Sequence, residues 1–274
     1  MKQSCGTVEE MRTLRFGFSP CPNDTFAFHA LAHRLVEAPF KVEPVLLDIE
    51  ELNQRAHTGE LELTKLSFGA FAGVGDRYRL LRSGAALGFG CGPLVVAREP
   101  IGLVRAAAGR IAVPGLQTTA FLLLRRFAPA LGEVVELRYD RILGAVERGE
   151  VEVGLIIHES RFTYAEHGLT RVCDLGELWE KQTGLPVPLA GICARSDLDM
   201  ATRTAAERVI RASVEYAFAH PEASRDYVRA NAQELSEEVR RAHIELYVND
   251  SSIDLGEKGM QAIESLLHAA PVSR

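Results

Sequence analysis

The chain has 274 residues, of which 47% are hydrophobic and 25% charged, and its formal net charge at pH 7 is −6. This composition is typical of a globular protein with one large domain or two smaller domains of about 100–150 residues each. Positive and negative residues are mixed along the chain, with no basic stripe and no Lys/Arg block, so we expect neither a nucleic-acid partner nor an anionic membrane surface.

The cysteines and the N-terminal residues predict a cytoplasmic protein. The cysteines are odd in number, far apart and without a CxxC pair, as expected for reduced thiols (Cys5, Cys21, Cys91, Cys173 and Cys193). The start, MKQSCGTVEEMRTLRF, has adjacent glutamates and no apolar core of a signal peptide. No stretch approaches the ~18 apolar residues of a membrane span.

The first third of the chain predicts alternating strands and helices. A strand over Leu14–Ser19 should end at Pro20-Cys21-Pro22, because proline cannot donate to a β-ladder. One of the three residues Asn-Asp-Thr at 23–25 is expected to cap a helix that begins at Phe26 and ends near Val36. A strand at 42–49, a helix at 50–57 and a strand in GELELTKLSF that runs into a loop are predicted next.

The same order of elements recurs in the middle of the chain. The predicted elements are a strand RIAV, a turn PGLQT, a helix TAFLLLRRFA, a strand VVELRYD, a helix DRILGAVERG and a strand EVEVGLIIHE. Thr25 and Thr119 precede similar helix starts 94 residues apart, and the motifs GELEL and GEVEV begin 90 residues apart. This repetition predicts two βαβαβ lobes of similar plan, each with a mostly parallel sheet.

Two apolar strands, Leu94–Arg98 and Leu189–Arg195, predict two crossings between the lobes that together form a hinge. The helical patterns of the last third would then return to the first lobe. We therefore expect a discontinuous lobe one, residues 1–97 plus 192–274, and an inserted lobe two, residues 98–191. An α/β protein of this kind binds its ligand in the cleft between the lobes, at the carboxyl ends of the strands.

By that rule four segments should converge on the cleft: SPCPNDT, TKLSF, VPGLQTTA and IHESRF. The prolines of the first segment would keep one wall of the cleft rigid. Helix N-termini after the first and third segments offer free N–H groups to an anion, above all a carboxylate. Ser67, Thr118 and Thr119 can add hydroxyl donors. Ordinary helix capping explains such residues equally well, and the repeated architecture favours ligand binding.

His158 is the strongest candidate for a catalytic residue. It follows the apolar run VGLII, so we expect it at the carboxyl end of a buried strand. Imidazole, with an ordinary pKa near 6.5, can accept a proton at cellular pH, and more readily where desolvation keeps it neutral. The alternative is a histidine that only hydrogen-bonds its loop. Glu159 and Arg161 flank it and are expected to play supporting roles at most.

Other candidate sites carry weaker signals. His29 and His33 lie one helical turn apart and could share a metal, but no third ligand is near in sequence, so we expect no metal and a packing role or an exposed position instead. Cys21, close to a helix start, could be a nucleophile, yet no histidine pairs with it in sequence, which favours a small turn residue. GFGCGP fits neither a Walker loop nor a dinucleotide fingerprint and is interpreted as the approach to the hinge.

Several long motifs together resemble the 1,4-dihydroxy-6-naphthoate synthase family of the futalosine branch of menaquinone biosynthesis. These motifs are SPCPNDTFAFHAL, TKLSF, LRSGAALGFGCGPLVVARE, IAVPGLQTTA, EVEVGLIIHESRFTY and DLGELWEKQTGLPVPL. The resemblance runs from Leu14 to about Gly259 and leaves the first dozen residues unmatched. It implies a type II periplasmic-binding-protein-like fold that serves as a cytosolic enzyme without a metal or organic cofactor.

The resemblance also implies an activity and a set of site residues. Members of the family convert cyclic dehypoxanthine futalosine, a small-molecule carboxylate, to 1,4-dihydroxy-6-naphthoate by carbon–carbon cleavage. The family's proton-accepting histidine matches His158. Its substrate-binding positions match Lys65, Leu66, Ser67, Thr118 and Thr119. The alternatives are a cytosolic small-carboxylate binding protein or sensor on the same fold, for which the chain lacks an export signal and a helix-turn-helix module, and a decarboxylase or hydrolase that uses Cys21. No oligomeric state is predicted.

Overall fold

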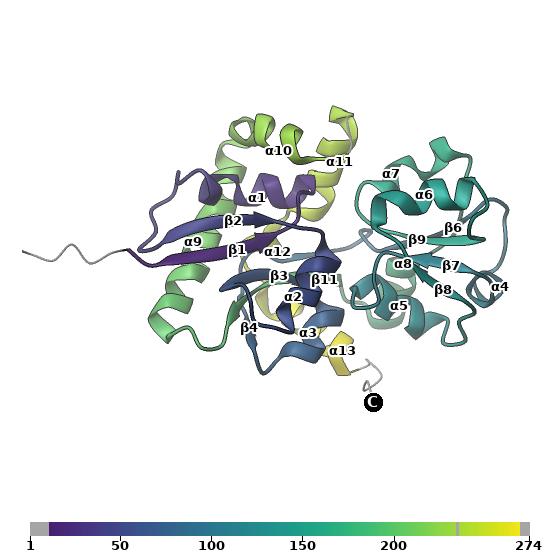
Figure 1. Cartoon of the computed structure of the whole chain (residues 1–274), viewed down its shortest axis with the longest axis horizontal. Helices are drawn as coiled ribbons and strands as arrows, with labels where there is room; N and C mark the ends of the chain where they lie inside the picture. Colours follow the sequence, from purple (N-terminus) through teal and green to yellow (C-terminus); the bar gives the residue numbers. More distant parts are fainter. Residues whose placement is uncertain (1–10, 234–235, 269–274) are drawn as a thin grey trace, which may run out of the picture.

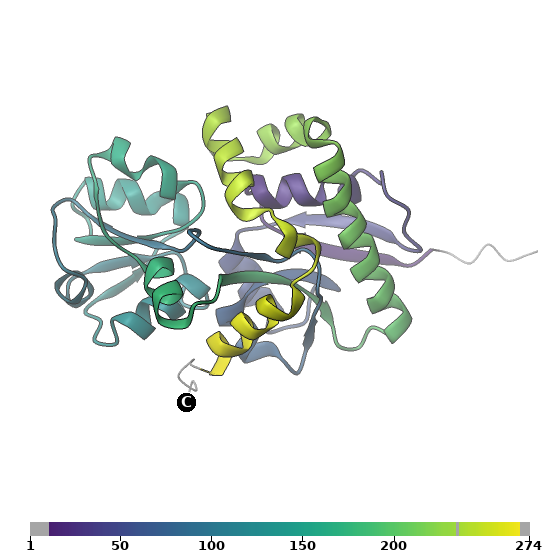
Figure 2. The ribbon, with the colours of Figure 1, turned by 180° about the vertical axis from the view of Figure 1, so that it is seen from behind.

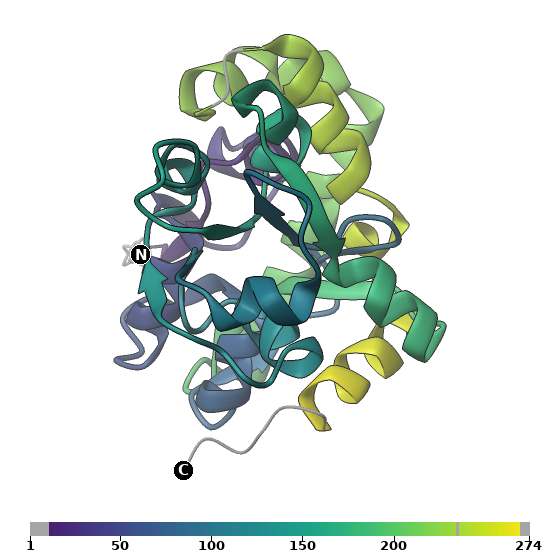
Figure 3. The same ribbon diagram turned by 90° about the vertical axis from the view of Figure 1, so that its right-hand side faces the viewer.

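The computed structural model describes residues 11–233 and 236–268, which form two α/β bodies side by side (Figure 1). One body is built on a six-stranded sheet and the other on a five-stranded sheet. In Figure 3 the second body faces the viewer and the first body lies behind it. Within the described ranges, no helix combines the length and apolar character needed to cross a membrane.

The first sheet has the strand order β2-β1-β3-β11-β4, with β5 also paired to β11. Its strands are β1 (Thr13–Phe18), β2 (Lys41–Leu46), β3 (Leu63–Ser67), β4 (Tyr78–Leu80), β5 (Ala86–Gly88) and β11 (Val187–Arg195). β1 is parallel to both β2 and β3, whereas β11 is antiparallel to β3, β4 and β5. The carboxyl ends of β1 and β3 therefore lie at the same edge of the sheet.

The second sheet has the strand order β10-β6-β9-β7-β8. Its strands are β6 (Leu94–Ala97), β7 (Ile111–Val113), β8 (Val134–Glu136), β9 (Val153–Ile156) and β10 (Thr170–Asp174). β7 is parallel to β8 and β9, and β6 is antiparallel to β9 and β10. The parallel triples β2-β1-β3 and β8-β7-β9 thus share one plan.

Helices connect the strands and cover the sheets. The α-helices of the first half are α1 (Pro22–Ala32), α2 (Ile49–Ala56), α3 (Phe68–Val74), α4 (Leu103–Ala108) and α5 (Thr119–Phe127). Those that follow are α6 (Tyr139–Glu147), α7 (Ser160–Thr163), α8 (Leu175–Thr183), α9 (Met200–Ala219), α10 (Arg225–Asn231), α11 (Glu237–Tyr247), α12 (Asp250–Ile253) and α13 (Gly256–His268). Short 3-10 helices occupy Tyr164–His167 and Pro221–Ser224. Figure 2 shows the C-terminal helices α9 and α13 packed on the first body.

The predicted repeat appears in the strands at equivalent positions. β3 begins at Leu63 and β9 at Val153, which are the last residues of the motifs GELEL and GEVEV. The first four residues of each motif precede the strand, so the motifs lead into the strands rather than forming them. The residues that follow the two strands, Phe68 and Ile157, both pack in one apolar cluster shared by the two bodies.

The chain passes between the bodies twice. β6 pairs within the second sheet, and all of β11 pairs within the first. Because β6 already belongs to the second sheet and β11 already belongs to the first, the crossings precede Leu94 and Val187. They lie a few residues earlier than the predicted limits at 97 and 191. The division into lobes of 1–97 plus 192–274 and 98–191 stays a prediction.

Helix α1 starts earlier than predicted. Its N-cap is Cys21, and Pro22 occupies the first turn, where its missing N–H costs no hydrogen bond. The expectation that one of residues 23–25 caps the helix was therefore wrong. These three residues lie inside the first turn, so their side chains are available for other contacts. The helix ends at Ala32 rather than near Val36, and Arg34 follows with a left-handed φ of 58°.

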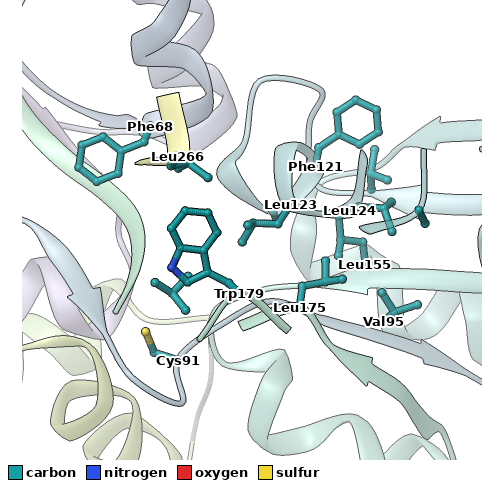
Figure 4. Close-up of a cluster of buried hydrophobic side chains, with 14 of the residues drawn as sticks. Phe68, Cys91, Val95, Phe121, Leu123, Leu124, Leu155, Leu175, Trp179 and Leu266 are labelled. Carbon is teal, nitrogen blue, oxygen red and sulfur yellow. The ribbon is translucent and has the colours of Figure 1, made fainter. Parts of the chain in front are cut away.

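One apolar cluster joins the two bodies (Figure 4). Trp179 of α8 is fully buried between side chains of both bodies, including Phe68 and Leu266 of the first and Leu123 of the second. Its indole N–H donates to the carbonyl of Pro186 at 3.0 Å. At the nearby crossing, a Cβ on Gly92 would lie 2.3 Å from Gly176 Cα. The glycine-rich crossing therefore allows close backbone packing at the junction.

Candidate active site

A cavity of about 70 Å³ lies between the two bodies. Its walls carry five of the six predicted site residues, namely Lys65, Ser67, Thr118, Thr119 and His158. Other lining residues are Ser19, Asn23, Ile49, Ala86, Cys91, Pro93, Ala120, Ile157, Leu189, Ala190 and Tyr247. Leu66 is the exception. Its side chain is fully buried on the opposite face of β3, in a cluster with Val74 and Tyr78, so only its backbone could face a ligand.

His158 follows β9 by two residues, at the carboxyl end where the sequence placed it. Its φ of 56° is left-handed, a conformation that non-glycine residues rarely adopt outside functional sites and turns. The imidazole packs edge-on against Tyr139, with 4.8 Å between the ring centroids. The backbone and the tyrosine together direct the ring toward the cavity.

The surroundings of His158 keep its imidazole neutral. Burial, followed by the nearby positive charge of Lys65, lowers its pKa to about 4, although Asp24 partly opposes both effects. Nε2 is shielded from solvent and makes no hydrogen bond within the described part of the chain. At cellular pH the side chain is therefore a neutral base with a free lone pair.

A buried polar network supports the wall of the cleft that the first body forms. Lys65 forms an ion pair with Asp24 Oδ1, and both side chains are almost fully buried. Asp24 Oδ2 accepts hydrogen bonds from the Ser19 backbone N–H at 3.0 Å and from the Ser19 hydroxyl at 2.7 Å. Asn23 Nδ2 donates to Asp24 Oδ1 at 2.8 Å. This network compensates the Lys65 charge and makes the proline-rich turn rigid.

Sequence reasoning missed His243, which comes from α11. It is fully buried, and its Nε2 lies 2.9 Å from Asn23 Oδ1. Its ring is 28° from parallel to that of His158, with 6.1 Å between the centroids. No motif could have indicated it, because it lies 85 residues after His158 in a helix with an ordinary amphipathic pattern. Only the packing of α11 against the first body brings it to the site.

The paired threonines use their hydroxyls within the protein. Thr118 is the N-cap of α5; its Oγ1 accepts from the Phe121 N–H at 3.1 Å and donates to the Gly115 carbonyl at 2.8 Å. Thr119 Oγ1 donates to the Leu189 carbonyl at 2.6 Å and accepts from the Gly69 N–H at 3.2 Å. Because the first amides of a helix have no intrahelical acceptor, the backbone N–H groups at the start of α5 are the stronger anion donors here.

Ser67 faces the threonines from the end of β3. Its backbone N–H donates to Asn53 Oδ1 at 3.0 Å, and its Oγ accepts from Asn53 Nδ2 at 3.1 Å. The Ser67 hydroxyl proton therefore remains available to a ligand. Asn53 Nδ2 also donates to Glu50 at 3.0 Å, and Glu50 accepts from the Gln117 N–H of the other body at 3.2 Å. Burial raises the pKa of Glu50, and its carboxylate helps to hold the two bodies together.

The other candidates from the sequence take structural roles. His33 Nδ1 lies 3.0 Å from the His29 carbonyl, and the two ring centroids are 4.4 Å apart with the rings tilted by 36°. Arg161 binds Asp174 at 2.6 Å and the Gly92 carbonyl, next to the junction of the two bodies. Burial and the nearby Glu159 carboxylate raise the pKa of the Cys21 thiol well above its ordinary value. Such a thiol is a poor nucleophile.

Cys21, His158 and Glu159 have donor atoms within 4.8 Å of one another, close enough for one ion. Thiolate is the form of cysteine that binds metals, and burial disfavours it here. The chemistry of this donor set therefore gives no reason to assign it a metal role. The arrangement is better suited to an organic anion, with a neutral imidazole after β9 and helix amides after the neighbouring parallel strand β7.

Comparisons with known proteins agree with this geometry. A family model described as menaquinone biosynthesis matches residues 14–271. The 1,4-dihydroxy-6-naphtoate synthase of Thermus thermophilus is 56% identical over 260 residues, which cover 95% of this chain and 94% of the relative. The enzyme of the same name from Streptomyces coelicolor is 46% identical over 264 residues, with coverage of 94% and 93%.

Solved structures confirm the predicted periplasmic-binding-protein-like fold. A protein of Archaeoglobus fulgidus superposes with a TM-score of 0.89 at 37% identity, covering 94% of this chain and 96% of its own. A Candida albicans protein described as having the generic periplasmic binding protein fold gives a TM-score of 0.67 at 14% identity, with coverage of 96% and 92%. This second likeness concerns the fold alone. Together with the family model and the curated relatives, the comparisons show that the chain belongs to the menaquinone-biosynthesis family.

Proposed function

We propose that the protein is a 1,4-dihydroxy-6-naphthoate synthase, which converts cyclic dehypoxanthine futalosine to 1,4-dihydroxy-6-naphthoate. Two relatives that carry this enzyme name align with nearly the whole chain. The observation that carries the mechanism is the neutral imidazole of His158, which lines the same cavity as Ser67 and the start of α5. A base and an anion site that share one cavity suit a carboxylate substrate from which a proton is removed.

In the proposed reaction His158 removes a proton from a hydroxyl of the sugar-derived ring. The O–H electron pair forms a carbonyl as the adjacent carbon–carbon bond breaks in a retro-aldol sense. The electrons of that bond enter the second ring, which is one cleavage short of aromatic, and aromatisation supplies the driving force. The protein then needs only a positioned base, an anchor and exclusion of water. We accordingly propose a lyase that works without a metal or organic cofactor in the cytoplasm.

The anchor in this proposal is the start of α5 together with Ser67 and Lys65. The backbone amides at the helix N-terminus would bind the substrate carboxylate, and the Ser67 hydroxyl would donate a further hydrogen bond. The Lys65 ammonium is paired with Asp24. It would therefore attract the substrate carboxylate less strongly than an unpaired ammonium would. The Thr118 and Thr119 hydroxyls would support the anchor by holding the helix start and the two bodies in place.

Substrate entry in this proposal requires the two bodies to separate. The cavity of about 70 Å³ is small for a bicyclic substrate, and hydrogen bonds such as Gln117 N–H to Glu50 join the bodies across it. We propose that the lobes of 1–97 plus 192–274 and 98–191 open at the two crossings and close again over the substrate. Closure would remove water before the proton transfer.

The test is direct incubation of the purified protein with cyclic dehypoxanthine futalosine, with the naphthoate product followed by mass spectrometry. Product formation that requires the protein and is lost in His158→Asn is the expected result. Binding of the substrate by calorimetry without any product would contradict the proposal and favour the alternative, a small-carboxylate binding protein or sensor.

A further inference from the structure

Two buried imidazole nitrogens beside the cleft have no hydrogen-bond partner within residues 11–233 and 236–268. They are Nε2 of His158 and Nδ1 of His243. The two rings are close to parallel, 28° apart, with centroids 6.1 Å from each other. Buried polar atoms are nearly always satisfied in folded proteins, so a neighbouring pair of unsatisfied nitrogens points to an interaction made in the working enzyme. α11, which carries His243, lies on the side of the first body toward the second (Figure 1).

Asn23 determines which nitrogen of His243 carries the proton. Asn23 Nδ2 donates to Asp24 Oδ1 at 2.8 Å, which orients the amide so that its Oδ1 faces His243. An amide oxygen only accepts, so His243 Nε2, 2.9 Å away, must be the donor. The neutral ring has a single N–H, and His243 Nδ1 is therefore left as a buried lone pair.

The surroundings of the two His158 nitrogens also indicate which of them carries the hydrogen. Nε2 is shielded from solvent, whereas the ring contributes to the cavity wall, so Nδ1 is the nitrogen left toward the cavity. If Nδ1 is to accept a proton from substrate, the hydrogen of the neutral ring must sit on Nε2. A donor at His158 Nε2 and an acceptor at His243 Nδ1 are complementary.

We infer that His243 is a positioning residue for His158, whose Nε2–H donates to His243 Nδ1 through one water molecule, since the two nitrogens make no direct hydrogen bond. This inference rests on the proposed function of His158 as the base. When the substrate O–H bond breaks, an N–H bond forms at His158 Nδ1, Nε2 keeps its hydrogen, and His243 gains none. His243 would hold the reactive tautomer before the step and stabilise the imidazolium after it, as the third member of a catalytic triad does.

The first test is spectroscopic and needs no substrate. The full chain labelled with ¹⁵N histidine is studied by long-range ¹H–¹⁵N correlation spectroscopy near neutral pH. His158→Asn and His243→Phe spectra assign the two sets of signals. We expect both rings to carry hydrogen at Nε2. A wild-type His158 protonated at Nδ1, or exchanging evenly between the tautomers, would overturn the inference.

The second test is kinetic. His243→Phe keeps a ring of similar size but removes both nitrogens, and we expect kcat to fall about 10- to 100-fold, the usual cost of losing an orienting partner, with KM little changed. The His158 signals should also show a mixture of tautomers. The matched control is His29→Phe, which alters a buried imidazole of α1 away from the cavity and should leave kcat unchanged. Full kcat in His243→Phe would overturn the inference.

The two proposals fail in distinguishable ways. If wild-type protein produced no naphthoate, the proposed function would be wrong, while the tautomer of His158 would still be measurable. If His243→Phe did not fold, the wild-type spectrum would still decide, because His158→Asn assigns the His158 signals. Naphthoate production with a His158 that is protonated at Nδ1 would leave the enzyme assignment standing and reject only the role of His243.

Discussion

The Lys65 ammonium and the Asp24 carboxylate, 41 residues apart in sequence, form an ion pair that is almost completely buried at the cleft. Their charges act in opposite directions on His158, because Lys65 lowers the pKa of the imidazole and Asp24 raises it. The pair therefore places a positive charge near the substrate anchor while limiting its effect on the base. Loss of either partner would disturb both folding and chemistry.

Asp24→Asn should strongly destabilise the protein. The change leaves the buried Lys65 without a compensating charge, and breaking a buried pair in this way costs about 3–5 kcal/mol. Urea unfolding at pH 7 measures the free energy of unfolding. The double variant Asp24→Asn with Lys65→Met removes the unpaired charge and should recover part of the loss. An Asp24→Asn protein as stable as wild type would show that the pair has no structural importance.

His158→Asn should abolish most turnover while leaving folding and substrate binding intact. Asparagine is close in size and can hydrogen-bond, but it cannot accept a proton at neutral pH. We expect kcat to fall by a factor on the order of 10²–10⁴, typical of a lost general base. Substrate affinity, measured by calorimetry, serves as the internal control. Near-normal turnover in this variant would move the search for the base to Glu159 and Cys21.

Turnover should be lost only at a pH well below that at which an ordinary histidine is protonated. An imidazole with its pKa lowered to about 4 remains a base throughout the neutral range. The rate should therefore be level from neutral pH down to weakly acidic pH and decrease only as the pH approaches that value. A profile of kcat against pH, in buffers of constant ionic strength, tests this. Half-maximal activity at a pH near the ordinary histidine pKa of about 6.5 would contradict this prediction and show that the His158 imidazole is hydrated.

The same pKa shift predicts how stability depends on pH. The unfolded chain binds a proton at His158 near pH 6.5, whereas the folded protein binds it only near pH 4. Between these values the unfolded state carries more protons, so the stabilising contribution of the neutral ring is present above the unfolded pKa and is lost as the pH falls. As the pH falls through this window, the unfolding free energy of wild type should decrease relative to that of His158→Asn. Parallel curves would contradict the shift.

Replacing Thr118 and Thr119 together with valine should weaken both the fold and the site. Loss of the Thr118 cap should cost about 0.5–2 kcal/mol of stability. Substrate binding should weaken by about 1–3 kcal/mol, because the hydrogen bonds that hold the helix start and the two bodies in place are lost. The backbone donors survive, so binding should not vanish. Paired serines at these positions keep both hydroxyls and provide the matched control. Unchanged affinity in the valine variant would exclude the hydroxyls from the site.

Much of this protein could be predicted from local pattern. Strand and helix periodicity, the repeat at 90 residues between Leu63 and Val153, and the apolar run before His158 all reflect constraints between near neighbours in the chain. Such constraints also place a residue at the end of a buried strand, and parallel strands bring their carboxyl ends to one edge. For that reason the locations of Lys65, Ser67, Thr118, Thr119 and His158 at one cleft were predictable.

What the tertiary structure alone decided is how these residues are paired and charged. The partner of Lys65 is Asp24, which sequence reasoning treated only as a helix cap, and the neighbour of His158 is His243 of α11. The burial that keeps His158 neutral arises from both bodies closing around it. Packing between segments far apart in sequence leaves no periodic pattern, because each such contact depends on one particular pair of residues and is not repeated along the chain. Local sequence patterns therefore determine which residues line the cleft, whereas the ion pair and the lowered pKa of His158 depend on the tertiary structure as a whole.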